Sequence, residues 1–345
     1  MLDYISLIGG LTILLVAGDV LVRGSVAVAQ RLGIPSLVIG LTIVAFGTSA
    51  PELVISLRAA LDGAPGIAVG NVVGSNIANV LLVMGVPALL ASTSCRQSGA
   101  TRNAVFLTVV TIIFITMCTF DPLGRPMGIA LLSLLALFLY NSVHEMRKAR
   151  KHRKIAAGLA ACAPEPCCDS DNELSISAVD TEGFLEEVES IPDGLPLAVF
   201  LMIVGLISLP VGGHLAIEGA VAIARQWGVT ETAIGLTVIA LGTSLPELAT
   251  TVMAVKRNHS AVALGNVIGS NVFNLLAILG TTAVIVPIAI PPEIMEFDIW
   301  VMLATTVLLM LLAIFRITLG KPAGFAMVGG YFAYIFVVFA IARTL

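Results

Sequence analysis

Two acidic residues occupy equivalent places in a repeated motif. The segment GTSAPEL at Gly47–Leu53 returns as GTSLPEL at Gly242–Leu248, so Glu52 corresponds to Glu247 at an offset of 195 residues. Each glutamate lies within a segment that is otherwise apolar enough to span a bilayer. A carboxylate at that depth is costly and needs a cation, a proton or a partner charge. Two such residues related by a repeat predict a cation site at the interface of two halves of the chain.

A second motif repeats at the same spacing. GNVVGSNIAN at Gly70–Asn79 returns as GNVIGSNVFN at Gly265–Asn274, again 195 residues later. When Gly40–Gly85 is laid without gaps over Gly235–Gly280, 21 of 46 positions are identical. The distance from the glutamate to the second motif is therefore the same in both halves, which indicates an internal duplication.

The polar side chains near the glutamates all offer oxygen. Hard cations such as calcium and sodium prefer oxygen ligands, and neither motif contains the histidine or cysteine that would suit zinc or copper. Other interpretations remain open: the glutamates could be protonated structural acids, the asparagines could form interhelical hydrogen bonds, and the small residues could serve close helix packing. The candidate side-chain ligands are Glu52, Glu247, Ser49, Ser244, Ser75, Ser270, Asn79 and Asn274.

Prolines in the first motif are expected to break the helices that carry it. Proline lacks a backbone donor and clashes with the preceding turn, so Pro51 and Pro246 should interrupt their helices near mid-membrane. Irregular backbone is tolerated at that depth only where a cavity or a bound ion satisfies the carbonyl oxygens. The freed carbonyls are expected at Ala45, Thr48, Ala240 and Thr243.

The composition places these motifs in a membrane protein. The chain is 58% hydrophobic and 12% charged, and its mean hydropathy of +1.02 is far from that of a soluble domain. About ten apolar segments long enough to span a bilayer are predicted, the first being a retained span and not a signal peptide. They lie near residues 4–22, 35–60, 66–92, 103–120, 126–145, 196–215, 230–255, 261–290, 297–315 and 324–342.

The basic residues predict the orientation. With ten spans, the loops that follow odd-numbered spans contain 14 of the 18 Lys and Arg residues, and the opposite side contains four. The positive-inside rule therefore makes the first side cytoplasmic. Both termini then lie outside, and because each half has an odd number of spans, the two repeats insert in opposite directions.

One hydrophilic stretch divides the two repeats. Residues 146–195 begin basic, end acidic and contain few aromatics, so they are expected to form a cytoplasmic linker. The predicted organisation is thus residues 1–145 as the first five-helix repeat, 146–195 as the linker and 196–345 as the second five-helix repeat. A thiol metal or redox site at Cys162, Cys167 and Cys168 is a weaker interpretation, because no histidine spacing accompanies these cysteines.

The doubled pattern GTSxPE followed by GNVxGSNxxN resembles the alpha-repeats of sodium/calcium exchangers, in the cation/calcium exchanger superfamily. The resemblance is strongest over Gly40–Gly85 and Gly235–Gly280, and the span count extends it over nearly the whole membrane region. It implies an all-α membrane protein of ten helices in two inverted five-helix repeats, with broken helices at mid-membrane.

The resemblance also implies a role for each candidate residue. Glu52 and Glu247 would share calcium with the backbone oxygens of Thr48 and Thr243. Sodium would use Ser49 and Ser75 in one half-site, Ser244 and Ser270 in the other, and the carbonyls of Ala45 and Ala240, while Asn79 and Asn274 would occupy the centre. Some prokaryotic relatives have an aspartate where this chain has Asn274. The first span of each half, Ile5–Val22 and Leu197–Leu215, would slide against the other eight helices.

The expected function is therefore sodium/calcium antiport by alternating access, without enzymatic activity or a cofactor. Calcium, sodium and the lipid bilayer are the expected partners, with no nucleic acid, and the plasma (cell inner) membrane is the expected location. The alternatives are a calcium/proton antiporter, an exchanger of another cation and a sodium-coupled solute symporter, which would need a larger apolar pocket. The ion pair, the stoichiometry, the direction and the oligomeric state stay open.

Overall fold

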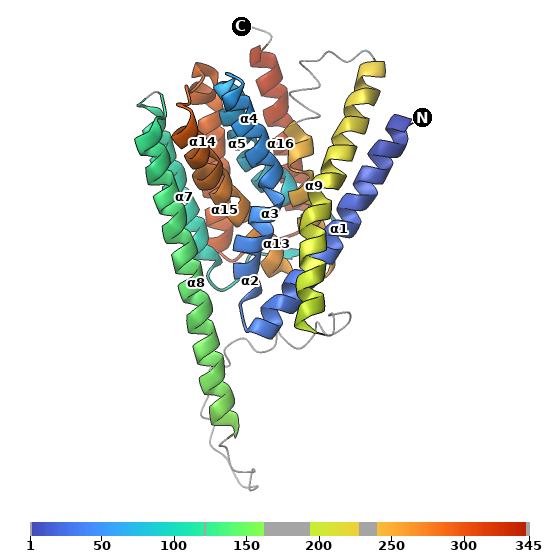
Figure 1. The fold of residues 1–345 in the computed structure, drawn as a ribbon, viewed down its shortest axis with the longest axis vertical. Helices are drawn as coiled ribbons and strands as arrows, with labels where there is room; N and C mark the ends of the chain where they lie inside the picture. Colours follow the sequence, from blue (N-terminus) through green and yellow to red (C-terminus); the bar gives the residue numbers. More distant parts are fainter. Residues whose placement is uncertain (1, 121, 162–193, 228–239, 343–345) are drawn as a thin grey trace.

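The computed structural model describes residues 2–120, 122–161, 194–227 and 240–342, and within them the chain is almost entirely helical (Figure 1). The helices form one elongated bundle, from which α8 projects at one end. The first residues of α1 and the last residues of α16 lie at the same end of the bundle.

The first half contains one long helix, two interrupted helices and two further helices. Its elements are α1 (Leu2–Leu32), α2 (Ser36–Ile39), η1 (Gly40–Val44), α3 (Ala45–Thr48), α4 (Ala50–Leu61), α5 (Pro65–Ala78), η2 (Asn79–Val83), α6 (Gly85–Leu90), β1 (Thr93–Ser94), α7 (Ala100–Cys118) and α8 (Arg125–Ala161).

The second half repeats this order, and several boundaries recur at the 195-residue offset. The π-helical turns η2 and η5, for example, begin at the equivalent residues Asn79 and Asn274. The elements are α9 (Leu195–Gln226), α11 (Ala240–Thr243), α12 (Leu245–Lys256), α13 (Ser260–Phe273), η5 (Asn274–Ile278), α14 (Leu279–Ile285), η6 (Ile294–Asp298), α15 (Ile299–Ile314), β2 (Thr318–Leu319) and α16 (Lys321–Ala342).

The predicted all-helical membrane fold is confirmed. In the described residues, eight helical segments are long and apolar enough to cross a bilayer, and the bent pair Ser36–Thr48 and Ala50–Leu61 forms a further broken span. The predicted seventh span, 230–255, is described only from Ala240 onward. The total of ten spans therefore remains a prediction.

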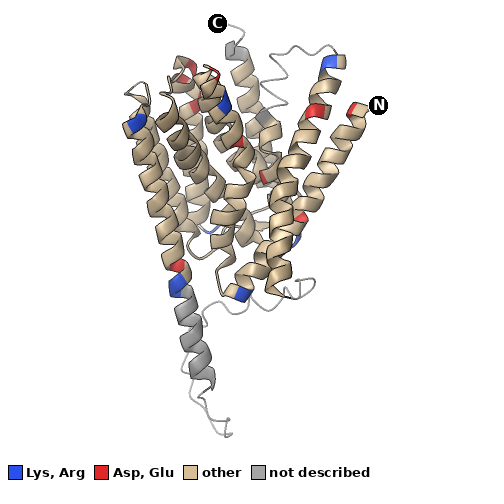
Figure 2. Cartoon of the chain, viewed as in Figure 1, with Lys and Arg blue, Asp and Glu red and all other residues tan. Residues whose placement is uncertain are grey.

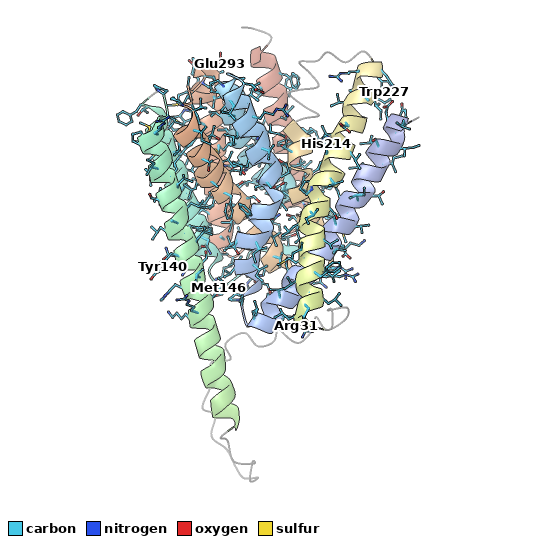
Figure 3. The ribbon with its side chains drawn as sticks, in the orientation of Figure 1. Arg31, Tyr140, Met146, His214, Trp227 and Glu293 are labelled. Carbon is cyan, nitrogen blue, oxygen red and sulfur yellow. The ribbon has the colours of Figure 1, made fainter. Side chains whose placement is uncertain are left out.

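The two repeats are inverted, as predicted. Position 32, at the end of α1, is equivalent to Trp227, which directly follows α9. Figure 3 nevertheless shows Arg31 toward the lower end of the bundle and Trp227 at the upper end. The short strand pairings are also related by the repeat: Thr93 pairs with Leu319, and its equivalent Ile288 pairs with Leu123, whose own equivalent Thr318 lies one residue before Leu319.

Three helices are longer than the predicted spans. α1 ends at Leu32 and α9 at Gln226, each about ten residues beyond the apolar core of its segment. No proline follows the predicted ends at Val22 and Leu215, and the next residues are rich in alanine and valine, so both helices continue. α8 likewise continues to Ala161, within the predicted linker, and residues 162–193 with their three cysteines lie outside the described residues.

The motif helices form the centre of the bundle. The α13–α14 segment is entirely buried and the α5–α6 segment is largely buried, whereas α1, α8, α9 and α16 keep most of their apolar side chains on the outside. Figure 2 shows the charged residues mainly toward the ends of the helices, with few in the middle of the bundle. The fold thus surrounds the two repeated motifs with the rest of the membrane region.

α1 and α9 lie side by side at one edge of the bundle (Figure 1) and pack through glycines. An added Cβ at Gly10 would lie 2.4 Å from the backbone of Ala216, and one at Gly205 would lie 2.7 Å from Leu21. Gly205 and Ala216 are the equivalents of Gly10 and Leu21, so the two contacts are related by the repeat symmetry. Small residues at such crossings let the helix backbones approach closely.

Candidate cation site

A helix break places each motif glutamate in the first turn of a new helix. Ser49 (φ −85°, ψ 6°) separates α3 from α4, and Ser244 (φ −85°, ψ 3°) separates α11 from α12 in the same way. The two parts of the first broken span meet at an angle of 44°, as the position of Pro51 predicted. Glu52 and Glu247 then lie in the first turns of α4 and α12. Their charges there are favoured by the positive end of the helix dipole.

Both carboxylates are buried and largely without partners. Glu52 and Glu247 are each 1% exposed, and they form no ion pair within the described part of the chain. Ser49 Oγ donates a hydrogen bond of 3.1 Å to Glu247 Oε1. Both oxygens of Glu52 and Oε2 of Glu247 have no hydrogen-bond partner in that same part of the chain. Buried charges normally have a partner, so these oxygens fit a site that takes a cation.

The central asparagines contribute two further oxygens without partners. Asn79 Nδ2 donates to Asn271 Oδ1 (3.0 Å), and Asn274 Nδ2 donates to Asn76 Oδ1 (3.2 Å). Among the described residues, Oδ1 of Asn79 and Oδ1 of Asn274 have no partner, although both side chains are buried. The two predicted central residues therefore present neutral carbonyl oxygens.

Buried hydroxyl side chains of the two repeats also make contact. Thr48 Oγ1 lies 3.4 Å from Ser270 Oγ, so the first broken helix contacts the second motif of the other half. Ser244 Oγ has no hydrogen-bond partner among the described residues. Ser75, the remaining predicted hydroxyl ligand, and Thr243, whose backbone oxygen is the predicted ligand, are also buried.

The carbonyl of Ala45 is not freed by the helix break. It accepts hydrogen bonds from the backbone N–H of Ser49 (3.0 Å) and from Thr48 Oγ1 (3.3 Å). The α-helical turn of α3 continues to Thr48. The helix is therefore interrupted too late in the chain to free the carbonyl of Ala45, contrary to the prediction. Ala240 begins α11 at the equivalent position, directly after residues outside the described part of the chain.

Sequence reasoning did not identify two asparagines that hold the broken helices in place. Asn71 Nδ2 donates to Ser56 Oγ (2.9 Å) and lies 3.4 Å from the carbonyl oxygen of Glu52. The equivalent Asn266 donates to Thr251 Oγ1 (3.1 Å) and lies 3.4 Å from the carbonyl oxygen of Glu247. Both asparagines belong to the repeated GNV segments, so their equal spacing in the two halves was the available signal.

α1 and α9 cover the two halves of the site unequally. An added Cβ at Gly18 of α1 would lie 3.1 Å from the backbone of Ala249 in α12, whereas one at the equivalent Gly213 would meet only the ring of Pro246, at 3.6 Å. Ala249 is 6% exposed and its equivalent Val54, in α4, is 64% exposed. In the described residues, α1 therefore covers α12 while α9 leaves the equivalent face of α4 uncovered.

In the part of the chain that the structure describes, an ion pair accompanies the covered side and has no equivalent on the uncovered side. Asp19 of α1 accepts hydrogen bonds from Arg257, at the end of α12, through both Nε and Nη2. The equivalents of these two residues are His214 and Asp62, and they do not pair with each other in the described residues. His214 Nε2 instead lies 3.1 Å from Glu218, and Asp62 lies 4.0 Å from Arg58.

Comparison with known proteins gives one consistent result. The family profile described as sodium/calcium exchanger protein matches residues 2–143 and 197–340. Inner membrane protein YrbG of Escherichia coli is 32% identical over 98% of this chain and 97% of its own length. Sodium/calcium exchanger MaX1 of Methanosarcina acetivorans is 30% identical over 98% of this chain and 99% of its own length.

The fold also matches solved structures. A structure of the sodium-calcium exchanger NCX_Mj, soaked with Na⁺ and Sr²⁺, has a TM-score of 0.76 and 27% sequence identity, covering 97% of each chain. The same exchanger soaked without Na⁺ and Ca²⁺ has a TM-score of 0.77.

Proposed function

Because this chain belongs to the sodium/calcium exchanger family, and is thus a cation/calcium exchanger of the membrane, we propose that it exchanges Na⁺ for Ca²⁺ at one shared site by alternating access. The observation that carries the proposal is a set of buried oxygens from both repeats that have no hydrogen-bond partner in the described residues. These atoms are Oε1 and Oε2 of Glu52, Oε2 of Glu247, Oδ1 of Asn79, Oδ1 of Asn274 and Oγ of Ser244.

The proposed calcium site uses both carboxylates. Two carboxylates balance the charge of one Ca²⁺, and calcium takes six to eight oxygen ligands of this kind. The backbone oxygens of Thr48 and Thr243 adjoin the two helix breaks from which Glu52 and Glu247 project, so they are the proposed backbone ligands.

The proposed sodium sites use one carboxylate at a time with neutral oxygens. Ser75 and Ser270 are buried on α5 and α13, and Ser270 already contacts Thr48 across the repeat boundary. The backbone carbonyl of Ala45 can contribute when Thr48 Oγ1 donates instead to Asn266 Oδ1, 3.3 Å away, because this frees one of the two lone pairs of the carbonyl oxygen. The proposed neutral sodium ligands are Ser49, Ser75 and Ala45 in one half-site and Ser244, Ser270 and Ala240 in the other. Asn79 and Asn274, at the centre, are proposed to contact either Ca²⁺ or Na⁺.

The same burial explains why transport would be an exchange. Closing the protein around two ionised carboxylates without a cation carries a large desolvation penalty. The penalty falls when one Ca²⁺ or several Na⁺ ions neutralise the pair. Switching is therefore expected only for the loaded site, so that each ion leaves in return for the other.

The unequal covering of α4 and α12 supports alternating access. Inverted repeats have two related states, in which the halves exchange conformations. In the second state α9 would cover α4 as α1 now covers α12. By the same relation, Asp19 and Arg257 would separate and His214 would approach Asp62. The helices proposed to move, α1 and α9, already contact each other through symmetric glycine positions.

The proposed location is the inner membrane of the cell, with both termini outside and the segment after α8 in the cytoplasm. The chain's relative YrbG is named as an inner membrane protein. Under this orientation the uncovered face of α4 opens to the outside. Arg31 and Met146 lie at the other end of the bundle from Trp227 and Glu293 (Figure 3), as that topology requires.

A flux assay separates this proposal from a calcium/proton antiporter. Purified protein is reconstituted into proteoliposomes loaded with Na⁺, and uptake of radioactive calcium is followed after dilution into Na⁺-free buffer. The proposal expects uptake that depends on the Na⁺ gradient. Uptake that ignores Na⁺ but follows an imposed pH gradient would assign the protein to proton exchange.

A further inference from the structure

The two central asparagines are held by hydrogen bonds that cross between the repeats. Asn79 donates to Asn271, and Asn274 donates to Asn76, while the carbonyl oxygens of Asn79 and Asn274 have no partner in the described residues. We propose that Asn76 and Asn271 are positioning residues that keep these two carbonyl oxygens turned toward the transported cation. The inference rests on the proposed cation site and adds to it the two residues that orient its neutral centre.

An asparagine needs such a restraint because its side chain has two different ends. The carbonyl oxygen attracts a cation, whereas the amide group has only donors and repels one. A half-turn about the last side-chain bond exchanges the two ends without changing the volume that the residue fills. An acceptor placed beside Nδ2 removes this ambiguity, because the reversed amide would bring two oxygens together. Asn271 Oδ1 and Asn76 Oδ1 are placed in this way, at 3.0 Å and 3.2 Å.

The hydrogen bonds connect helices that belong to different repeats. Asn76 and Asn79 lie three residues apart on one helix, where side chains are neighbours. Asn76 nevertheless accepts from Asn274, which lies 198 residues away. Each half of the centre is therefore oriented by the other half. A change at Asn76 should act on the ligand in the second repeat and leave the nearby Asn79 in place.

The positioning residues are themselves held differently. Asn76 Nδ2 lies 3.7 Å from the sulfur of Met302 in α15, so a second helix restrains its amide. Asn271 Nδ2 has no partner among the described residues, and Leu107, the equivalent of Met302, offers no acceptor. Asn76 is therefore the better restrained of the two, and it is the residue chosen for the test.

The test is a pair of double-mutant cycles on Ca²⁺ affinity. Asn76→Ala is made alone, with Asn274→Ala, and with Asn79→Ala, in the full-length protein. Calcium binding to the purified proteins is measured calorimetrically in Na⁺-free buffer, and thermal unfolding reports whether each variant is folded. If alanine at one position prevents purification, the cycles are repeated with Asn76→Ser, Asn274→Ser and Asn79→Ser, since serine is too short to replace the lost contact.

The expected result is a coupling between distant residues. Asn76→Ala should weaken Ca²⁺ binding about tenfold, the size of one misplaced polar contact. In the Asn274→Ala background the same change should have less than about a twofold effect, because there is no amide left to orient. In the Asn79→Ala background the tenfold loss should persist.

Two outcomes would overturn the inference. Equal losses in all three backgrounds would mean that Asn76 acts without Asn274, and a loss that disappears only with Asn79→Ala would mean that it acts on its own helix. In both cases the parent protein still binds Ca²⁺ and the proposed exchange stands. Absence of Ca²⁺ binding in the parent protein would instead contradict the proposed function itself.

Discussion

Ser49 of the first repeat donates a 3.1 Å hydrogen bond to Glu247 of the second repeat. The equivalent hydroxyl, Ser244 Oγ, has no partner in the described residues, and neither oxygen of Glu52 is hydrogen-bonded there. The first repeat thus contributes a hydroxyl group directly to the glutamate of the second, and we propose that both glutamates belong to one cation site. Because the site is shared in this way, loss of either carboxylate should affect every ion that it binds.

Glu52→Gln and Glu247→Gln should each abolish calcium transport. Either change removes half of the negative charge that balances Ca²⁺, while a neutral amide is less costly to bury than a carboxylate. Both variants should therefore insert and purify normally. Calcium uptake into proteoliposomes is the measurement, with Glu293→Gln, at an exposed position, as the matched control. Near-normal uptake in one of the two variants would make that glutamate structural.

Ser75→Ala and Ser270→Ala should affect sodium more than calcium. Calcium can use both carboxylates, whereas each sodium ion depends on fewer and mostly neutral oxygens. Loss of one hydroxyl ligand should cost ~1–3 kcal/mol, or roughly one to two decades in sodium affinity. The Na⁺ concentration for half-maximal exchange is compared with that of Ser133→Ala, whose hydroxyl is exposed on α8. An equal shift for both ions would show that these serines do not distinguish them.

The two proposed conformational states differ in which side-chain pair is in contact, so each state can be trapped by a cysteine cross-link. In a background without the five native cysteines, Asp19→Cys with Arg257→Cys should cross-link in the state described here. Asp62→Cys with His214→Cys should cross-link only in the opposite state. Each cross-link should stop transport, and reduction should restore it.

The accessibility of the site then distinguishes the two traps. The 19–257 cross-link should leave a cysteine at Val54 accessible from outside, since Val54 is exposed in this state. The 62–214 cross-link should protect it. If Val54→Cys reacts equally in both traps, α9 does not come to cover α4.

The predicted orientation can be tested by labelling from one side of the membrane. A single cysteine at Ile155, within α8 beyond the predicted span, should react only when the membrane is permeabilised. One at Asp62, at the opposite end of the bundle, should react in intact cells. Labelling of position 155 from outside would reverse the orientation.

Much of the fold could be predicted because the same motifs occur in both halves, so each half supports the interpretation of the other. The apolar segments, the inverted repeats and the break before Pro51 follow from composition, charge asymmetry and proline chemistry. The ends of α1, α8 and α9 could not be predicted, because these helices continue past the bilayer-length apolar segment, α8 into a basic run and α1 and α9 into mixed sequence rich in alanine and valine.

The site was predicted as a set of residues, but its hydrogen bonds were not. The motif indicated Glu52, Glu247 and the oxygen donors around them, because buried acids and repeated hydroxyls are visible in sequence. The pairs Asn79–Asn271 and Asn274–Asn76 depend on how the two repeats face each other, which no local pattern specifies. The unequal covering of Ala249 and Val54 could not be predicted either. These residues occupy equivalent positions in the two repeats, and the sequence does not indicate which of the two is covered.

The central claim is that Ca²⁺ and Na⁺ alternate at one site between the repeats. Its most direct test is counterflow of radioactive calcium in proteoliposomes, with Na⁺, K⁺ and H⁺ gradients imposed one at a time. An outward Na⁺ gradient alone should drive calcium accumulation, and Glu52→Gln should abolish it. Calcium accumulation that is indifferent to Na⁺ but follows the H⁺ gradient would contradict the account.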